Sequence, residues 1–166
     1  MGDEFEFAIC TDAACPSNPG PVEYRGVCIS TGDELFFYGP YLGGSVNIAE
    51  FLAIVEGIKY LLCYSGLDPE SDCWKYKMLN RVQHDSRKNM TKQYILYSDS
   101  KIAISRVQKG IINTQILPNS NNKELFTKIQ EAEGRLHNHP TRSQSIILKK
   151  RPTSQRGQIP ADFGRK

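Results

Sequence analysis

The fold is decided by residues 5–21, which read FEFAICTDAACPSNPGP. From Phe5 to Thr11, large side chains alternate with other residues in the period-two pattern of a β-strand. The strand is predicted to end on Asp12, where a Pro- and Gly-rich turn begins. An Asp in this position is a common turn initiator, so it indicates a functional site only if other carboxylates occupy matching positions.

Two more strands are predicted, over residues 23–30 and 34–42, with a hairpin turn over the Thr-Gly-Asp at 31–33. Three successive strands with short connections imply an antiparallel meander. A helix follows over residues 47–63, because apolar side chains recur there at helical spacing. Glu50 lies in line with this apolar stripe and is predicted to face the sheet, where a carboxylate is costly unless something compensates it.

Residues 94–98 (YILYS) form a short apolar run typical of a strand buried on both faces. The run leads directly into Asp99, which in this position is also a good helix N-cap. Two further helices are predicted over 100–108 and 123–136, the second with Leu125, Ile129 and Ala132 as its inner face. The remaining predicted elements are a strand over 143–148, an irregular basic segment over 149–157 and a short terminal helix over 159–166, with Asp162 in its first turn.

The predicted order of elements is β-β-β-α-β-α-α-β-α, which indicates an α/β fold with a mixed sheet of five strands flanked by helices. A right-handed crossover through the first helix would return the fourth strand beside the first. The length of 166 residues fits one domain over 1–166. Within it, residues 64–93 lose their periodicity and are predicted to be an insertion or an elaborated connection.

The charge is unevenly distributed along the chain. Residues 1–74 carry 12 acidic and 2 basic side chains, whereas residues 75–166 carry 6 acidic and 19 basic ones, for a net charge of +3. Such asymmetry favours a surface for a polyanion, with nucleic acid first, and the alternative is a solvated basic half. Five cysteines without a C-x-x-C pair, and no apolar run of membrane-spanning length, indicate a cytoplasmic protein with no membrane partner.

Four carboxylates are predicted to converge in this fold: Asp12, Glu50, Asp99 and Asp162. Without a cation they would repel one another strongly. Divalent metal resolves the repulsion, and carboxylate oxygens suit Mg²⁺ or Mn²⁺. Two such ions, about 3.5–4 Å apart, form a clamp for in-line displacement at phosphorus.

Four motifs also match a known family in order and spacing. They are TDAACPSNPGP at 11–21, GGSVNIAEFLAIVEGI at 43–58, YSDSKIAI at 97–104 and the ending IPADFGRK at 159–166. Over nearly its whole length the chain resembles ribonuclease H of the type 1 class. The ending resembles a subgroup that finishes in this way. The chain departs from the family pattern at Ala13 (usually Gly), at Val46 (usually Asn) and between 149 and 156, where the usual His is absent.

The resemblance implies a ribonuclease H-like three-layer fold and a metal-dependent endoribonuclease. Such an enzyme cleaves the RNA strand of RNA–DNA hybrids with two Mg²⁺ ions, for which Mn²⁺ can substitute, and leaves a 5′-phosphate and a 3′-hydroxyl. It implies that Asp12, Glu50, Asp99 and Asp162 are both catalytic and metal-binding. Asp12 would bridge the ions, Asp162 would serve the water-activating ion, and Glu50 and Asp99 would hold the ion on the leaving-group side.

The resemblance also implies contacts with the hybrid, which a protein distinguishes through the 2′-hydroxyl. The predicted nucleic-acid-binding residues are Ala13, Asn18, Asn47, Ser100, Lys149 and Lys150. For Asn18, a purely turn-forming role remains an alternative. Two other functions stay open, a DNA nuclease of the same fold and a catalytically weak hybrid-binding module. We expect a monomer without a small-molecule organic cofactor.

Overall fold

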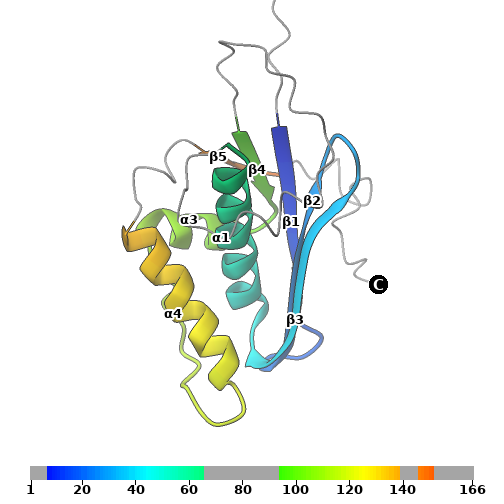
Figure 1. Ribbon diagram of the computed structural model, residues 1–166. Coiled ribbons are helices and arrows are strands. Elements are labelled where there is room, and N and C mark those ends of the chain that lie inside the picture. Colours follow the sequence, from blue (N-terminus) through cyan, green and yellow to red (C-terminus); the bar gives the residue numbers. More distant parts are fainter. Residues whose placement is uncertain (1–6, 66–93, 139–145, 152–166) are drawn as a thin grey trace, which may run out of the picture.

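The computed structural model describes residues 7–65, 94–138 and 146–151 (Figure 1). Within these ranges the chain forms five strands and three helices. In order they are β1 (Phe7–Ala14), β2 (Gly20–Cys28), β3 (Glu34–Gly44), α1 (Val46–Ser65), β4 (Tyr94–Ser98), α3 (Lys101–Lys109), α4 (Lys123–Asn138) and β5 (Ile146–Lys150).

The strands form one mixed sheet in the order β3-β2-β1-β4-β5. β1, β2 and β3 pair antiparallel, whereas β4 runs parallel to both β1 and β5. The predicted α/β fold is therefore confirmed, with its five-stranded mixed sheet, its antiparallel first three strands and the adjacency of strands one and four. Parallel neighbouring strands require a crossover connection. Helix α1 lies in the connection between the β1–β3 meander and β4.

Helix α1 lies against the sheet over β1, β2 and β4, and both α3 and α4 contact α1 (Figure 1). The main core is the apolar layer between α1 and the sheet, and it includes Ile9, Phe51, Ile54, Ile58 and Leu96. The predicted inner face of α4 is confirmed, since Leu125, Ile129 and Ala132 are all buried. Of the helices described here, none is long and apolar enough to cross a membrane.

Several strands extend further than the sequence pattern indicates. β1 continues two residues past Asp12 to Ala14, because the chain there still pairs with Tyr24 and Glu23 of β2. β5 includes Lys149 and Lys150, which the sequence analysis assigned to an irregular segment, and both pair with the end of β4. That prediction is wrong because a neighbouring strand, absent from any local pattern, supplies the hydrogen-bond partners.

Some predicted features lie outside the described residues. They are the insertion, apart from its first two residues in α1, and the terminal helix with the IPADFGRK ending. The single-domain assignment over 1–166 and the insertion stay predictions.

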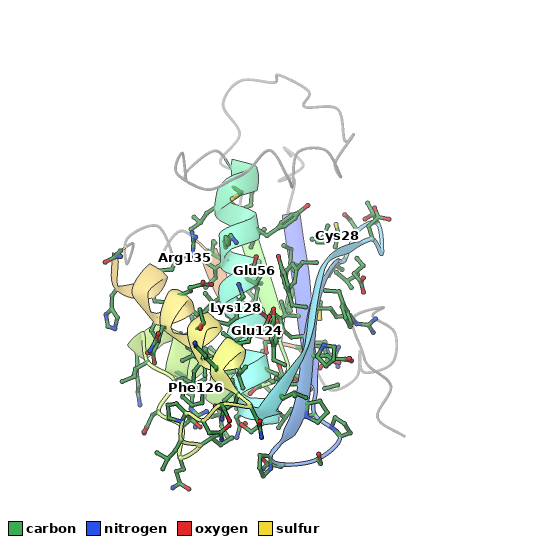
Figure 2. All side chains as sticks on the ribbon, turned by 60° about the horizontal axis from the view of Figure 1, so that its bottom comes forward. Cys28, Glu56, Glu124, Phe126, Lys128 and Arg135 are labelled. Atoms are coloured by element: carbon green, nitrogen blue, oxygen red, sulfur yellow. The ribbon has the colours of Figure 1, made fainter. Side chains whose placement is uncertain are left out.

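A hollow of about 390 Å³ lies between α1 and α4, lined by residues that include Glu56, Lys128 and Arg135 (Figure 2). Glu56 accepts a hydrogen bond from the Tyr38 hydroxyl at 3.3 Å and forms an ion pair with Lys59 at 3.2 Å. None of the predicted site residues lines this hollow, so it is separate from the carboxylates described next.

Candidate metal-binding and catalytic site

Asp12 and Asp99 are brought side by side by the parallel pairing of β1 and β4. The last register pair between these strands joins Thr11 to Ser98. Asp12 directly follows Thr11 and Asp99 directly follows Ser98, so the two aspartates lie on neighbouring backbones immediately after this pair. Asp12 lies within β1 and pairs with Arg25 of β2, which corrects the prediction that it ends the strand. The site therefore lies at the end of β4, whereas β1 continues past it.

Glu50 reaches the same point from α1. It lies in the second turn of the helix and is only 2% exposed, while Asp12 is 5% exposed and Asp99 is half-buried. One carboxylate oxygen from each of Asp12, Glu50 and Asp99 lies within 4.8 Å of the other two. Three of the four predicted carboxylates therefore meet, and the fourth, Asp162, lies outside the described residues.

The first turn of α3 is capped by Ser100. The Ser100 hydroxyl accepts a hydrogen bond from the Ala103 N–H at 3.2 Å, and the Ser100 backbone has the extended conformation of an N-cap. Asp99 was predicted to be a good N-cap itself. Because Ser100 fills that position, the Asp99 carboxylate is left to face Asp12 and Glu50.

The three carboxylates have the chemistry of a site for a hard divalent cation. Oxygen donors favour Mg²⁺ and Mn²⁺, whereas zinc sites typically combine His and Cys ligands. Carboxylates that lie within 4.8 Å of one another with two of the three buried repel each other more than they would in water. The donor set and its burial therefore fit a divalent ion such as Mg²⁺.

A cationic residue that the sequence analysis did not single out lies beside this cluster. Arg151 follows β5, and its backbone N–H donates to the Ser98 carbonyl at 2.9 Å. Its side chain is only 4% exposed, and Nη1 donates to the Cys10 Sγ at 3.8 Å. The sequence pattern indicated an irregular basic segment at Arg151. Extending the alternation of β5 would not have predicted its burial, because Lys149, two residues earlier on the same face, is exposed.

The predicted nucleic-acid-binding residues differ widely in exposure. Ala13 is buried in the core, so its side chain offers no contact to a ligand. Asn18 is exposed in the turn after β1, and Asn47 is half-buried in the first turn of α1. The Ser100 hydroxyl already accepts the capping hydrogen bond of α3, while Lys149 and Lys150 are exposed on β5. Of these six residues, only Asn18, Lys149 and Lys150 are exposed.

No protein-family model matches the chain. Similar solved structures include LC11-RNase H1 isolated from compost, at 18% identity and a TM-score of 0.46, covering 93% of this chain and 89% of that one. Another is RNase H1 from the halophilic archaeon Halobacterium salinarum, at 15% identity and a TM-score of 0.48, covering 94% and 92%.

A third is the N-terminal RNase H domain of rv2228c from Mycobacterium tuberculosis, at 14% identity and a TM-score of 0.44, covering 93% of this chain and 92% of that one. A second structure of LC11-RNase H1 is a complex with an RNA/DNA hybrid. At these identities the similarity is one of fold.

Proposed function

We propose that the protein is a metal-dependent endoribonuclease that hydrolyses the RNA strand of RNA–DNA hybrids. The observation that carries this proposal is the meeting of Asp12, Glu50 and Asp99, with one oxygen of each within 4.8 Å of the other two. Their positions are also those of the ribonuclease H motifs in the sequence. A cluster of buried carboxylates is unfavourable in a protein unless it binds a cation, so a role in metal binding explains it best.

The proposed roles of the residues are those that the resemblance to ribonuclease H implies. Asp12, which meets Glu50 of α1 and Asp99 after β4, is the proposed shared ligand of two ions. Asp162 is proposed as the fourth ligand. Bound Mg²⁺ would activate the attacking water and stabilise the leaving oxygen. The chain itself fixes three of the ligands on a strand, a helix and a strand end, which keeps them oriented before substrate arrives.

The proposed substrate is held by the groups around this site. Asn18 and Asn47, together with backbone groups near Ala13 and Ser100, are the proposed contacts to the hybrid. Lys149 and Lys150 are exposed at the end of β5, which pairs with the strand that leads to Asp99. They are the proposed phosphate contacts, because lysine binds phosphate as a point charge.

The test is cleavage of a labelled RNA–DNA hybrid in Mg²⁺, in Mn²⁺ and in chelator, with single-stranded RNA and duplex DNA alongside. We expect cutting only with metal, only in the RNA strand and with 5′-phosphate ends. Asp12→Asn and Asp99→Asn should each lower the rate by at least about 100-fold, while hybrid binding survives. Asp33→Asn, an exposed carboxylate in the β2–β3 hairpin, is the matched control and should keep full activity.

Two other outcomes would point to the alternative functions. Cutting of duplex DNA with the hybrid left intact would indicate a DNA nuclease. Binding of the hybrid without cutting in either metal would indicate a hybrid-binding module. Full activity in both Asp12→Asn and Asp99→Asn would contradict the carboxylate site itself.

A further inference from the structure

Arg151 is tied to the carboxylate cluster through the backbone. Its N–H donates to the carbonyl of Ser98, the residue directly before Asp99. β5 pairs in parallel register with β4 up to Lys150 and Ser98. A displacement of Arg151 would therefore also displace the end of β4, which positions Asp99.

The Arg151 side chain lies on the sheet face that carries Asp12. Cys10, which accepts from Arg151 Nη1 at 3.8 Å, belongs to a small buried cluster separate from the main core that holds Ile9 and Ala13. Successive residues of a strand point to opposite faces, so Cys10 and Asp12 share a face. The guanidinium contacts the residue two positions before the central carboxylate of the site.

The charge that faces Arg151 comes from the carboxylates. A cysteine thiol is ordinarily uncharged at pH 7, so the contact with Cys10 does not supply this charge. Burial by itself would lower the pKa of Arg151, but Cys10, Asp99 and Asp12 together raise it. An arginine is in any case not deprotonated in proteins. Arg151 follows Lys150, which pairs with Ser98, so this permanent, nearly inaccessible positive charge is carried by the strand neighbouring the one that ends before Asp99.

We propose that Arg151 is a built-in counter-cation of the carboxylate cluster, which holds Asp12 and Asp99 in place before metal binds and limits how tightly the metal is held. The second half rests on the proposed function, because it requires that the cluster binds divalent metal. Arg151 acts through the carboxylates and is a positioning residue. At 4% exposure, its side chain is too buried to serve as a phosphate contact.

This role has two consequences of opposite sign. Without metal, removing the charge leaves the carboxylates to repel one another, so the protein becomes less stable. With metal, removing the charge also removes a repulsion between the guanidinium and the incoming ion, so the ion binds more tightly. A purely structural arginine would lower the stability without tightening metal binding.

The test compares Arg151→Met, which keeps the length of the side chain, with Arg151→Lys, which keeps the charge. Arg135→Met removes the same charge from α4, a helix whose main contacts with other elements are with α1 and β3 (Figure 2). Thermal unfolding in chelator and calorimetric titration with Mg²⁺ or Mn²⁺ alone are the readouts. We expect Arg151→Met to lower the melting temperature and to tighten metal binding about three- to tenfold. Arg151→Lys should lie closer to wild type, and Arg135→Met should leave metal affinity unchanged.

A double-mutant cycle with Asp99→Asn tests the metal-free half separately. In chelator, Arg151→Met should cost much less stability in the Asp99→Asn background than in wild type, since the charge to be compensated is gone. If Arg151→Met fails to fold, the double variant should restore folding. Independent effects of the two substitutions, or failure of both variants to fold, would overturn the proposal.

Failure of the proposed function gives a different pattern. If the wild-type protein binds neither Mg²⁺ nor Mn²⁺, the proposed metal site is wrong, and so is the proposed effect of Arg151 on metal affinity. The double-mutant cycle in chelator still decides whether Arg151 stabilises the carboxylates. If wild type binds metal but Arg151→Met binds it no more tightly, the inference about Arg151 is wrong while the proposed function stands.

Discussion

Ser100 and Asp99 are neighbours with separate tasks at the start of α3. The Ser100 hydroxyl accepts from the N–H of Ala103, and this bond satisfies one of the backbone donors that a helix leaves open at its first turn. The Asp99 carboxylate lies with Asp12 and Glu50 instead. Stability of the helix and chemistry of the site are therefore carried by two adjacent side chains.

At the residue scale, we expect Ser100→Ala to lower the free energy of unfolding by about 1 kcal/mol, because it removes the cap. Its affinity for Mg²⁺ should change little, since all three carboxylates remain. Urea denaturation and a metal titration measure the two quantities. Ser120→Ala, an exposed serine in the turn before α4, should shift the free energy of unfolding by less than about 0.5 kcal/mol. Equal costs for the two variants would rule out the capping role.

At the scale of elements, the position of Glu50 depends on how closely α1 packs on the sheet. Gly57 lies where the helix crosses β1 and β4. A Cβ atom there would lie 2.5 Å from Leu96 Cδ1 and 3.2 Å from Thr11 Cγ2. Thr11 immediately precedes Asp12, so the contact that sets the distance between α1 and the sheet is adjacent to the site. The glycine lets a helix carboxylate and a strand carboxylate approach each other.

We expect Gly57→Ala to lower the free energy of unfolding by about 1–3 kcal/mol, because Leu96 is buried and the helix must move away. Weaker Mg²⁺ binding should accompany this loss, as Glu50 is carried away from Asp12. Gly134→Ala in α4 is the matched control. A Cβ there meets nothing within 4 Å, so alanine should stabilise the protein by up to about 1 kcal/mol through helix propensity. Denaturation curves that move in the same direction for both variants would contradict the packing argument.

At the scale of the whole molecule, the charge is separated along the chain. The acidic first part supplies Asp12 and Glu50, and residues 75–166 carry 19 of the 21 basic side chains. The exposed Lys149 and Lys150 of β5 belong to this basic part. Under the proposed function, the basic part attracts the polyanion, and a bound metal ion allows Asp12 and Glu50 of the acidic part to lie close to it.

We expect the affinity for an RNA–DNA hybrid to fall steeply with salt, because cationic contacts to phosphate release counterions. The measurement is fluorescence anisotropy of a labelled hybrid over a series of KCl concentrations. Lys149→Gln and Lys150→Gln should each reduce the slope of log affinity against log salt by about 1 if the lysine contacts phosphate. Lys109→Gln, at the far end of α3, is the control and should leave the slope unchanged. An affinity independent of salt would contradict a phosphate-binding surface.

The sequence by itself determined the type and order of the described elements and three carboxylates of the candidate site. Strand alternation and helical spacing depend only on which face of an element is apolar. They predicted the three-stranded meander, the buried strand at 94–98 and the inner face of α4. The same periodicity placed Glu50 toward the sheet, and the motif spacing selected Asp12 and Asp99.

Only the tertiary structure decided where the strands end, which side chain caps α3 and which basic side chain is buried. β1 continues past Asp12 because β2 offers it partners, and β5 takes in Lys149 and Lys150 because β4 does the same. Ser100 rather than Asp99 caps α3, since an N-cap needs a particular backbone conformation. Arg151 is buried beside Cys10, 141 positions away in the sequence. Local patterns cannot contain such pairings, because they form between segments that only folding brings together.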